Sequence, residues 1–551
     1  MASNSPFPDV EIPDTDIWGI TFDRKDRDFP DDKVIYRAVD SDRKHTFADV
    51  RNLATLFGEG LRNLWDWQKN DVLALYAPND VDISPVIYGT FFAGGIVTPA
   101  NPSYSKDELA YQLENAEAKA LVTTKASMKT ALDAAKKVGI PNDRVILLGA
   151  ERDETHQCKH WTSIRKTSSS ARYRRRKADP QDIAFLAYSS GTTGLPKGVQ
   201  LIHRNIVSNV LVVQGGVGHW YSSAEDKFLG VLPFFHLYGL TALVHQVMHR
   251  GIELIVMPAF DLKTFLQAIQ EHKITHIYVA PPVIVRLSRD NMARAYDLSS
   301  VKMITCGAAP LTRELVDTVY EKLNLKVNQA YGLSETSAMT HAQPWDEWNT
   351  YIGSVGKLLP NLTAKYISPN GTPVGPGTPG ELLLRGPTVF TGYWKNPSAT
   401  ASSFTPDGFF KTGDIGFQDT HGNFYITDRV KELIKYKGFQ VAPAELEGKL
   451  MENELVDDVA VIGVQDEEMH TEVPRAYVVP AQAIRERAGE QEARGIVEWT
   501  DKKVANHKRL RGGVVFVKEV PKSASGKILR RVLKDRWKGD VGLGVVKRAR
   551  L

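Results

Sequence analysis

The sequence predicts an α/β protein: a large N-terminal domain of layered α/β sheets plus a β subdomain, then a small mobile α+β C-terminal domain. Short apolar runs at 72–76, 121–123, 145–148, 183–187, 254–257 and 276–280 are separated by segments of helical length, which is typical of buried parallel strands. The chain becomes rich in Gly and Pro after Ser368, and a compact unit begins near Arg429. We therefore expect an N-terminal domain at 1–428, with its β subdomain at about 360–428, and a C-terminal domain at 429–551.

Individual elements follow from local patterns. The apolar residues of 47–64 fall on one face, which predicts an amphipathic helix, and alternation around 381–385 predicts short strands of the β subdomain. In the last domain, 459–464 and 477–479 have the pattern of strands in a βαβ-like unit. Loops that follow parallel strands meet at one sheet edge, where ligands usually bind, so functional motifs are expected on those loops.

Composition argues against several classes of protein. Hydrophobic residues make up 42% and charged residues 24% of the chain, which is ordinary usage for a soluble folded protein. A net charge of +4 is too small at this length to indicate nucleic acid as a partner. Cys158 and Cys306 lack ligand spacing, which argues against a disulfide framework or a structural zinc site. The most apolar stretch, 86–97, is too short to cross a bilayer, so no membrane span is expected, and the polar N-terminus has no signal-peptide pattern.

The last three residues, Ala549, Arg550 and Leu551, form a small-basic-Leu tripeptide that resembles the peroxisomal address Ser-Lys-Leu. Such a tripeptide also occurs by chance, but Lys547 and Arg548 place it in a basic context. We expect recognition by the peroxisomal import receptor and a peroxisomal location, with the cytoplasm as the alternative.

The strongest local signal is YSSGTTGLPKGV at 188–199, which directly follows the apolar run at 183–187. Glycines let the backbone approach a ligand, hydroxyls donate hydrogen bonds, and a lysine supplies a cation. These residues are Gly191, Gly194, Gly198, Ser189, Ser190, Thr192, Thr193 and Lys197. The set suits a polyphosphate, although it is not the Walker pattern because glycine follows the lysine. The alternative is a flexible surface turn.

A second element, QAYGLSET at 329–336, follows the strand-and-turn segment MITCGAAPL at 303–311. Glu335 offers the hard oxygen ligands that Mg²⁺ prefers, and Thr336 offers a hydroxyl for a phosphate. A glutamate in a loop is, as the alternative, simply solvated.

A third element is the turn of Thr412, Gly413 and Asp414, followed after one short strand by Asp428 and Arg429. A carboxylate and a guanidinium can hold ribose hydroxyls there, or they can form a salt bridge that only stabilises the turn. Lysines then cluster near the domain boundary, and a final lysine stands in PKSASGKILRR at 521–531. Lysine clusters are usually solvent-facing, so these carry little weight alone.

Together these segments resemble the adenylate-forming superfamily of acyl-CoA synthetases, firefly-type luciferases and peptide-synthetase adenylation domains. The resemblance spans nearly the whole chain and adds LPFFHLYG at 232–239 and DRVKELIKYKGFQVAPAELE at 428–447 to the motifs above. Within the superfamily, KELIKYKGFQVAPAELE is most similar to the 4-coumarate and phenylacetate CoA ligase group. The resemblance implies ATP, Mg²⁺ and coenzyme A as cofactors, and a small carboxylic acid as the substrate that is converted to acyl-AMP and then to acyl-CoA.

The resemblance also implies a role for each matching residue. The β- and γ-phosphates would be held by Ser189, Ser190, Gly191, Thr192, Thr193, Gly194 and Lys197, the α-phosphate by Thr336, and Mg²⁺ by Glu335. The adenine site would comprise Ala308, Gln329, Ala330, Tyr331 and Gly332, and the ribose site Asp414 and Arg429. Lys527 would be the adenylation lysine, His236 and Tyr238 would border the acyl pocket, and Lys431 would be the hinge for domain rotation. After rotation, Lys435, Lys437, Gly438 and Gln440 would serve AMP and CoA.

The candidate acyl pocket is built mainly from small or apolar residues, which is consistent with an aryl or medium-length acyl tail. Its members are His236, Tyr238, Thr241, Thr305, Cys306, Gly307, Ala308, Gly332, Ala338 and Met339. Thr305 stands where coumarate ligases commonly carry Lys, and Thr241 where they carry Asn, which argues against recognition of a phenolic hydroxyl. Ala259 replaces a lysine that contacts CoA in plant relatives. Cys306 is expected to pack in the core and not to act as a nucleophile.

Three functions are compatible with the sequence. The first is a CoA ligase. The second is a luciferase-like oxidoreductase, or an acyl-adenylating enzyme with a non-CoA acceptor. The third is a nucleotide-binding module without catalysis, which the presence of Glu335 and Lys527 disfavours.

Overall fold

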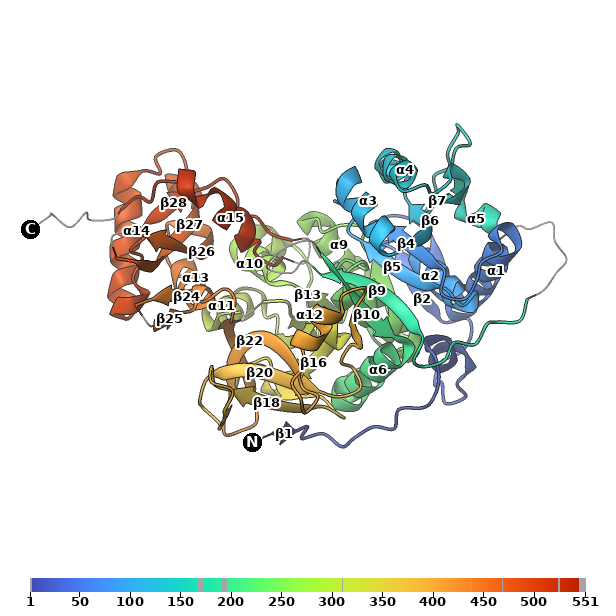
Figure 1. The fold of residues 1–551 in the computed structure, drawn as a ribbon, viewed down its shortest axis with the longest axis horizontal. Helices are drawn as coiled ribbons and strands as arrows, with labels where there is room; N and C mark the ends of the chain where they lie inside the picture. Colours follow the sequence, from blue (N-terminus) through green and yellow to red (C-terminus); the bar gives the residue numbers. More distant parts are fainter. Residues whose placement is uncertain are drawn as a thin grey trace, which may run out of the picture.

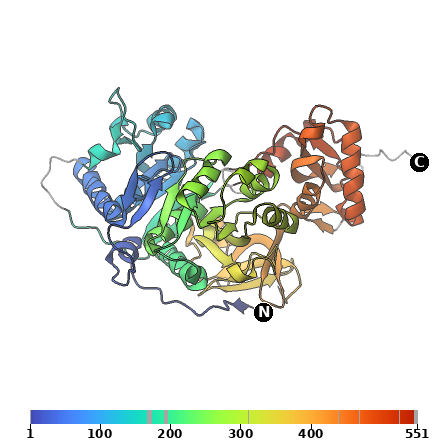
Figure 2. The ribbon, with the colours of Figure 1, turned by 180° about the vertical axis from the view of Figure 1, so that it is seen from behind.

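The computed structural model describes residues 2–165, 173–189, 196–309, 311–437, 439–467, 469–523 and 526–544. A large body contains the N-terminal part of the chain, and a smaller lobe formed by the C-terminal part projects from one side (Figures 1 and 2). The lobe has a hydrophobic core of its own, with members between Ile434 and Leu533. It is therefore a separate packing unit, and its core begins just after the boundary expected at 428.

The first sheet of the body is mostly parallel. In spatial order it contains β21 (Gly392–Tyr393), β10 (Lys197–Ile202), β9 (Ile183–Ser189), β5 (Ile96–Ala100), β4 (Val72–Tyr76), β6 (Ala118–Thr123), β7 (Val145–Leu147) and β8 (Lys159–His160). The strands from β9 to β8 run parallel, whereas β10 pairs antiparallel with both β9 and β21. All side chains of β4 and β5 are buried, which explains why these strands are continuous apolar runs.

The second sheet of the body carries most of the motifs. Its order is β17 (Lys357–Leu358), β16 (Ala338–Ala342), β15 (Val327–Leu333), β14 (Met303–Cys306), β13 (His276–Val279), β11 (Lys227–Gly230), β12 (Glu253–Val256), β2 (Val34–Ala38) and β3 (Lys44–Thr46). The strands from β15 to β2 run parallel, and the outer pairs are antiparallel. Consequently the segments after β14 and at the end of β15 emerge at the same edge.

A third, antiparallel sheet forms the β subdomain. It has the order β1 (Ser3–Asn4), β18 (Thr363–Ile367), β20 (Gly380–Arg385), β22 (Phe410–Gln418) and β23 (Phe424–Arg429), with β19 (Pro373–Val374) beside β18. The N-terminal segment runs along the body to reach this sheet (Figure 1). The pairing of β22 with β23 places Asp414 directly opposite Arg429.

The C-terminal lobe corrects one expectation from the sequence. It contains β24 (Ile434–Tyr436), β25 (Phe439–Val441), β26 (Val456–Asp466), β27 (Thr471–Pro480) and β28 (Val514–Phe516). The βαβ assignment of 459–464 and 477–479 was wrong, because β26 and β27 are antiparallel neighbours joined by a short turn. The parallel pair is β27 and β28, and α14 (Glu490–Lys503) lies between them in the chain.

Helices cover the sheets, and the mixed α/β fold class expected from the sequence is confirmed. The body has α1 (Phe47–Trp65), α2 (Ile83–Phe92), α3 (Lys106–Asn115), α4 (Met128–Lys137), α5 (Trp161–Ile164), α6 (His203–Val217), α7 (Leu237–Gly239), α8 (Gln246–Arg250), α9 (Leu262–His272), α10 (Pro281–Arg289), α11 (Arg313–Leu323) and α12 (Pro397–Ser402). The lobe adds α13 (Pro443–Met451) and α15 (Arg530–Arg536). The helix expected at 47–64 is α1, which begins with a capping box between Thr46 and Asp49.

Candidate active site

The predicted phosphate loop connects two adjacent strands. Ser189, the last residue of β9, lies opposite Lys197, the first residue of β10. The other expected phosphate-binding residues, Ser190, Gly191, Thr192, Thr193 and Gly194, lie outside the described residues. The strand pair therefore brings one hydroxyl and one ammonium group to the entrance of this loop.

Glu335 lies beside that entrance. Its carboxylate accepts hydrogen bonds from the hydroxyls of Ser189 at 3.4 Å and Tyr393 at 3.0 Å. The ring of Tyr393 also lies 5.1 Å from the Lys197 ammonium nitrogen. Tyr393 thus contacts both the expected metal ligand and the expected phosphate cation, and sequence reasoning missed it. Its place in β21, paired with β10, comes from a long-range contact that local motifs do not reveal.

Thr336 has a structural contact in this arrangement. Its hydroxyl lies 3.1 Å from the carbonyl oxygen of Leu333 and 2.9 Å from that of Ala338, and the side chain is buried. These contacts fix the turn that carries Glu335. The contact expected between Thr336 and the α-phosphate stays a prediction.

An ionic cluster joins β15 to the β subdomain. The carboxylate of Asp414 accepts a hydrogen bond from the Tyr331 hydroxyl at 2.6 Å and pairs with Arg429 at 3.0 Å. Burial and the neighbouring Asp414 raise the pKa of Tyr331 well above its ordinary value, so its hydroxyl stays protonated and keeps donating. Ala308, which has φ = 75° and is exposed, lines the same cavity as Tyr331.

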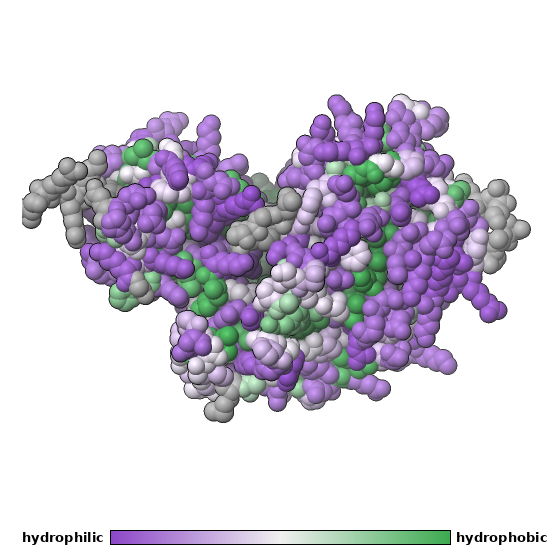
Figure 3. Space-filling model, viewed as in Figure 1, coloured by the Kyte–Doolittle hydropathy of each residue, from purple (hydrophilic) through white to green (hydrophobic). Residues whose placement is uncertain are grey.

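Lys527 comes from the C-terminal lobe and reaches this cluster. The φ of Gly526 is 81°, and a side-chain carbon there would lie 3.0 Å from the ring of Pro282, so the loop is seated tightly against α10. Burial and the nearby charge of Arg429 lower the pKa of Lys527 from 10.5 to about 8, while Glu432, Asp414 and Glu335 act in the opposite direction. The site is therefore assembled from both parts of the chain, and Figure 3 shows the surface hollowed between the lobe and the body.

A second contact between the lobe and the body is made by Arg289. The guanidinium of Arg289, at the end of α10, donates to the carboxylate of Asp457 at 2.6 Å and to the carbonyl oxygen of Val456 at 3.3 Å. Both charged side chains are partly exposed, so the pair can exchange with water at modest cost.

A small cavity with mostly apolar walls adjoins the cluster. It is lined by His236, Leu237, Tyr238, Gly307, Ala308, Ala330, Tyr331, Gly332, Leu333, Ala338 and Met339. A side-chain carbon at Gly332 would lie 1.6 Å from the Ala338 carbonyl oxygen, so this position requires glycine. At Gly307 it would lie 3.0 Å from the Tyr238 ring, which would have to shift slightly. Burial and the Lys527 ammonium lower the pKa of His236 to about 4, which keeps this imidazole neutral at physiological pH.

Three residues expected in the acyl pocket are buried behind this cavity and do not line it. The Thr241 hydroxyl donates to the carbonyl oxygen of Ser337 at 3.3 Å, and the Thr305 hydroxyl donates to Asn328 at 2.7 Å. Cys306 is also buried, and burial raises the pKa of its thiol, which disfavours the thiolate that a nucleophile needs.

The residues expected to act after rotation lie elsewhere. Lys435, Lys437 and Gln440 are exposed on the β24–β25 hairpin, and Gly438 lies outside the described residues. Lys431 is exposed in the turn between β23 and β24. The other expected adenine residue, Gln329, accepts a hydrogen bond from the Leu311 backbone at 3.0 Å, which ties the segment after β14 to β15.

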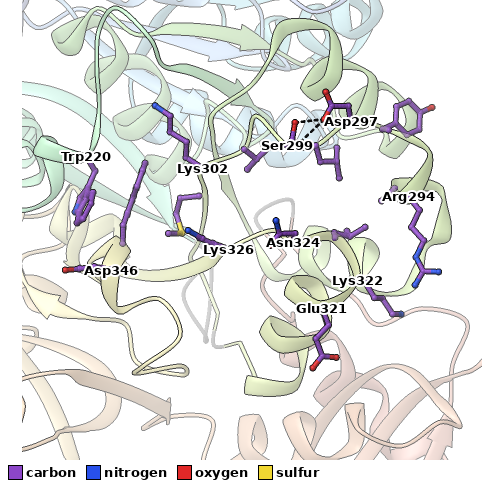
Figure 4. Close-up of a pocket in the computed structure, with 17 residues that line it drawn as sticks. Trp220, Arg294, Asp297, Ser299, Lys302, Glu321, Lys322, Asn324, Lys326 and Asp346 are labelled. Atoms are coloured by element: carbon purple, nitrogen blue, oxygen red, sulfur yellow. Dashed lines mark hydrogen bonds between the residues drawn. The ribbon is translucent and has the colours of Figure 1, made fainter.

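A larger surface cleft, of about 910 Å³, is not part of this site. Lys302, Asn324 and Lys326 in its wall precede β14 and β15, so the cleft opens at the opposite edge of the sheet (Figure 4). Ligands of parallel sheets usually bind at the carboxyl ends of the strands, which is where the cluster and the small cavity lie.

Comparison with known proteins agrees with this assignment. The sequence matches the AMP-binding enzyme family over residues 22–394 and the AMP-binding enzyme C-terminal domain over residues 445–527. It is 38% identical over 482 residues to a probable 4-coumarate–CoA ligase of Dictyostelium discoideum, which covers 85% of this chain and 86% of that protein. It is 35% identical over 541 residues to a phenylacetyl-CoA ligase of Aspergillus niger, with 96% and 98% coverage. ATP-bound MatB from Rhodopseudomonas palustris has the same fold, with a TM-score of 0.83, 27% identity and coverage of 96% and 99%.

The protein has a two-lobed α/β fold, and Lys527 of the lobe lies near the buried Asp414 carboxylate and the apolar cavity. Together with these relatives, this arrangement defines an adenylate-forming ligase. The chain belongs to the AMP-binding enzyme family and is an enzyme of the acyl-CoA ligase class. Of the helices formed by the described residues, none is long and apolar enough to cross a membrane.

Proposed function

We propose that this acyl-CoA ligase activates a small aryl or arylalkanoic acid of the phenylacetate or cinnamate type, or a medium-chain acid. The observation that carries the proposal is the cavity lined by small and apolar residues, which adjoins the ionic cluster that Lys527 reaches. Its apolar wall suits the tail of such an acid, with the carboxylate towards the ammonium group. The cavity holds about 40 Å³ in this structure, so the wall must move outwards for a ring to enter. The names of relatives that act on 4-coumarate and phenylacetate give further support.

In the first half-reaction, a carboxylate oxygen of the acid attacks the α-phosphorus of ATP. A new C–O–P linkage forms, the bond to the bridging oxygen breaks, and pyrophosphate leaves with the electron pair. Two anions must meet, so cations placed in advance carry much of the catalysis. We assign this role to Lys527 and Lys197, with Asp414 and Arg429 on the ribose and Ala308, Gln329, Ala330, Tyr331 and Gly332 around the adenine.

The residues at the entrance of the phosphate loop fit a magnesium ion. Mg²⁺ is usually held by one or two carboxylates plus substrate phosphate oxygens, and Glu335 with the Ser189 hydroxyl supplies that kind of donor set. No group of three or more His, Cys, Asp or Glu that could hold a metal by itself occurs in the described ranges. When bound, the ion would neutralise phosphate charge, and Tyr393 would keep the carboxylate of Glu335 oriented.

In the second half-reaction, the sulfur of CoA attacks the acyl carbonyl and AMP leaves, which gives the thioester. In this proposal Lys527 lies on the side from which the adenylate is approached, so the lobe must turn before the thiol can arrive. We assign the turn to Lys431 and the second catalytic face to the exposed hairpin with Lys435, Lys437 and Gln440.

The test is a coupled assay with ATP, Mg²⁺, CoA and a panel of phenylacetate, cinnamates, benzoates and medium-chain fatty acids, ranked by kcat/KM. We expect AMP release that depends on CoA. Light emission, or activation that leaves the thiol unchanged, would support the luciferase-like or non-CoA alternatives. Failure of every acid to exchange labelled pyrophosphate into ATP would refute adenylation of these acids.

The lowered pKa of Lys527 predicts an alkaline limit to adenylation. The protonated form is the active one, so kcat/KM for ATP should fall as pH rises through about 8, close to tenfold per pH unit above it. The limb of kcat should lie at higher pH, because bound phosphates stabilise the ammonium ion. Lys527→Arg is the control, because a guanidinium does not titrate in this range. An unchanged alkaline limb in that variant would assign the titration to another group.

Replacement of Tyr393 by Phe removes the hydrogen bond to Glu335 and keeps the ring beside Lys197. We expect the Mg²⁺ concentration for half-maximal pyrophosphate exchange to rise roughly tenfold, the usual cost of losing support for a metal ligand. The rate at saturating Mg²⁺ should change little. Tyr425→Phe is the matched control, because the Tyr425 hydroxyl contacts Asp419 at 3.4 Å and not Glu335. Equal effects in both variants would remove Tyr393 from the metal site.

We also propose that the enzyme works in peroxisomes, through Ala549, Arg550 and Leu551, which lie outside the described residues. The basic tripeptide resembles a receptor-read peroxisomal address. A fluorescent protein carrying the last ten or so residues, which include the basic context, should enter peroxisomes through the import receptor. The same fusion without the tripeptide should stay in the cytoplasm. Cytoplasmic fluorescence in both cases would refute the proposal.

A further inference from the structure

Arg530 lies three residues after Lys527 and forms a dense buried ion network. Its guanidinium donates to both carboxylate oxygens of Glu447, at 2.8 and 2.6 Å, and to the carbonyl oxygen of Val461 at 3.2 Å. It also pairs closely with Glu432. The side chains of Arg530, Glu432 and Glu447 are only 10%, 11% and 12% exposed. A planar guanidinium suits this arrangement, because its three nitrogens stand in a fixed fork and each has its own partner: Nη2 binds Glu447, Nη1 binds Glu432 and Nε donates to Val461.

Glu432 is the important partner because of its place in the chain and in the site. It directly follows Lys431, the proposed hinge, and its charge acts on both Lys527 and Arg429. An unpaired carboxylate in this position would attract the ammonium group of Lys527. In the observed arrangement, the nearer cation, Arg530, already pairs with it.

Hydrogen bonds between residues of the same segment stabilise the loop that carries Lys527. The Ser523 backbone donates to the Lys527 carbonyl oxygen at 2.8 Å, the Lys527 backbone donates to the Ser523 hydroxyl at 3.1 Å, and Leu529 donates to Pro521 at 2.8 Å. This compact loop leads directly into α15, whose first residue is Arg530. The guanidinium therefore fixes the loop relative to the turn that follows the hinge.

We propose that Arg530 is a positioning residue for the adenylation step: it sequesters Glu432 against Glu447, so that the Lys527 ammonium stays free for the substrate carboxylate and the α-phosphate. Arg530 itself touches neither substrate. The inference rests on the proposed role of Lys527. The new element is that the Arg530–Glu432 ion pair determines whether the Lys527 ammonium binds Glu432 or the substrate.

The test compares half-reactions in Arg530→Met. Pyrophosphate exchange should fall by up to about a hundredfold, the scale for misplacing a reacting group by about 1 Å, while thioester formation from supplied acyl-AMP changes little. Because Glu432 then pairs with Lys527, the alkaline limb of adenylation should move above pH 8. A change that only loosened the lobe would not raise this limb. Arg536→Met is the control, because Arg536 is exposed on the same helix and pairs with Asp540 at 3.4 Å.

Removal of the released carboxylate gives the sharpest result. Arg530→Met combined with Glu432→Gln should recover most of the lost exchange activity, because the carboxylate that Arg530 had held away from Lys527 is gone, and Glu447 is not among the groups whose charge acts on Lys527. If Arg530→Met does not fold, Arg530→Lys serves the same test, since it keeps the charge and loses the planar fork that holds Glu432, Glu447 and Val461 together. Equal loss in both half-reactions, or no recovery in the double variant, overturns the proposal. Absence of exchange in the unaltered enzyme would instead refute the proposed function.

Discussion

Lys527→Ala should lower adenylation by about 10²–10³-fold, the scale for removing one preorganised charge-stabilising donor. The lysine is the cation that the C-terminal lobe adds to the cluster of Asp414, Arg429 and Glu335. Its loss removes one of the cations that compensate the approach of the carboxylate to the phosphate. The measurement is the rate of pyrophosphate exchange at saturating ATP and acid.

The same variant should form thioester from supplied acyl-AMP and CoA at a rate close to that of the unaltered enzyme, because the lobe presents another face in that step. Lys518→Ala is the control, since Lys518 is exposed on the segment that precedes the loop. An equal fall in both half-reactions would contradict the model in which the two steps use different faces of the lobe.

Asp414→Asn should have the second-largest effect, and it should act on nucleotide binding. The carboxylate is 2% exposed and holds both Tyr331 and Arg429. Neutralising it removes a charged acceptor for the ribose and leaves the Arg429 guanidinium without its partner. A hydrogen bond to a charged group contributes about 1.5–3 kcal/mol, which corresponds to roughly 10–10²-fold in affinity. We expect ATP and AMP to bind more weakly by similar factors, measured by calorimetry, because the ribose is common to both.

The affinity for AMP distinguishes this variant from Lys527→Ala. We expect Asp414→Asn to weaken AMP binding, whereas Lys527→Ala should change it little. Asp407→Asn is the control in the same β subdomain, because Asp407 is 56% exposed in an ion pair with Lys365, and surface pairs of this kind contribute little. Full retention of AMP affinity in Asp414→Asn would remove this residue from the ribose site.

Local patterns in the sequence were sufficient for much of the fold. Continuous apolar runs, such as Val72–Tyr76, became buried parallel strands because both faces of the sheet are covered. The β26–β27 pair was missed because charged residues such as Glu472 interrupt the apolar pattern where the strands approach their turn. The remaining apolar pieces looked far enough apart for a crossover helix, whereas the two strands form one long antiparallel pair.

The site was predictable where chemistry is local and not where it depends on distant contacts. Glu335, Asp414, Arg429 and Lys527 each stand in a recognisable motif, and the structure brings them together. Tyr393 and Arg530 were missed, because their partners come from other elements and only the folded chain shows them. Thr305 was expected to line the pocket, but its hydroxyl is bound to Asn328 behind the wall, which residue type alone does not reveal.

Lys527, which lies between the lobe and the body, couples nucleotide binding to the position of the lobe. Keeping an ammonium ion in a poorly hydrated crevice disfavours the closed shape while the crevice is empty. A triphosphate supplies the missing counter-charge, so it favours the closed shape, and by thermodynamic reciprocity the closed shape binds the triphosphate more tightly. In the proposed mechanism, part of that attraction is lost once pyrophosphate departs, and the lobe is then free to turn so that the thiol gains access.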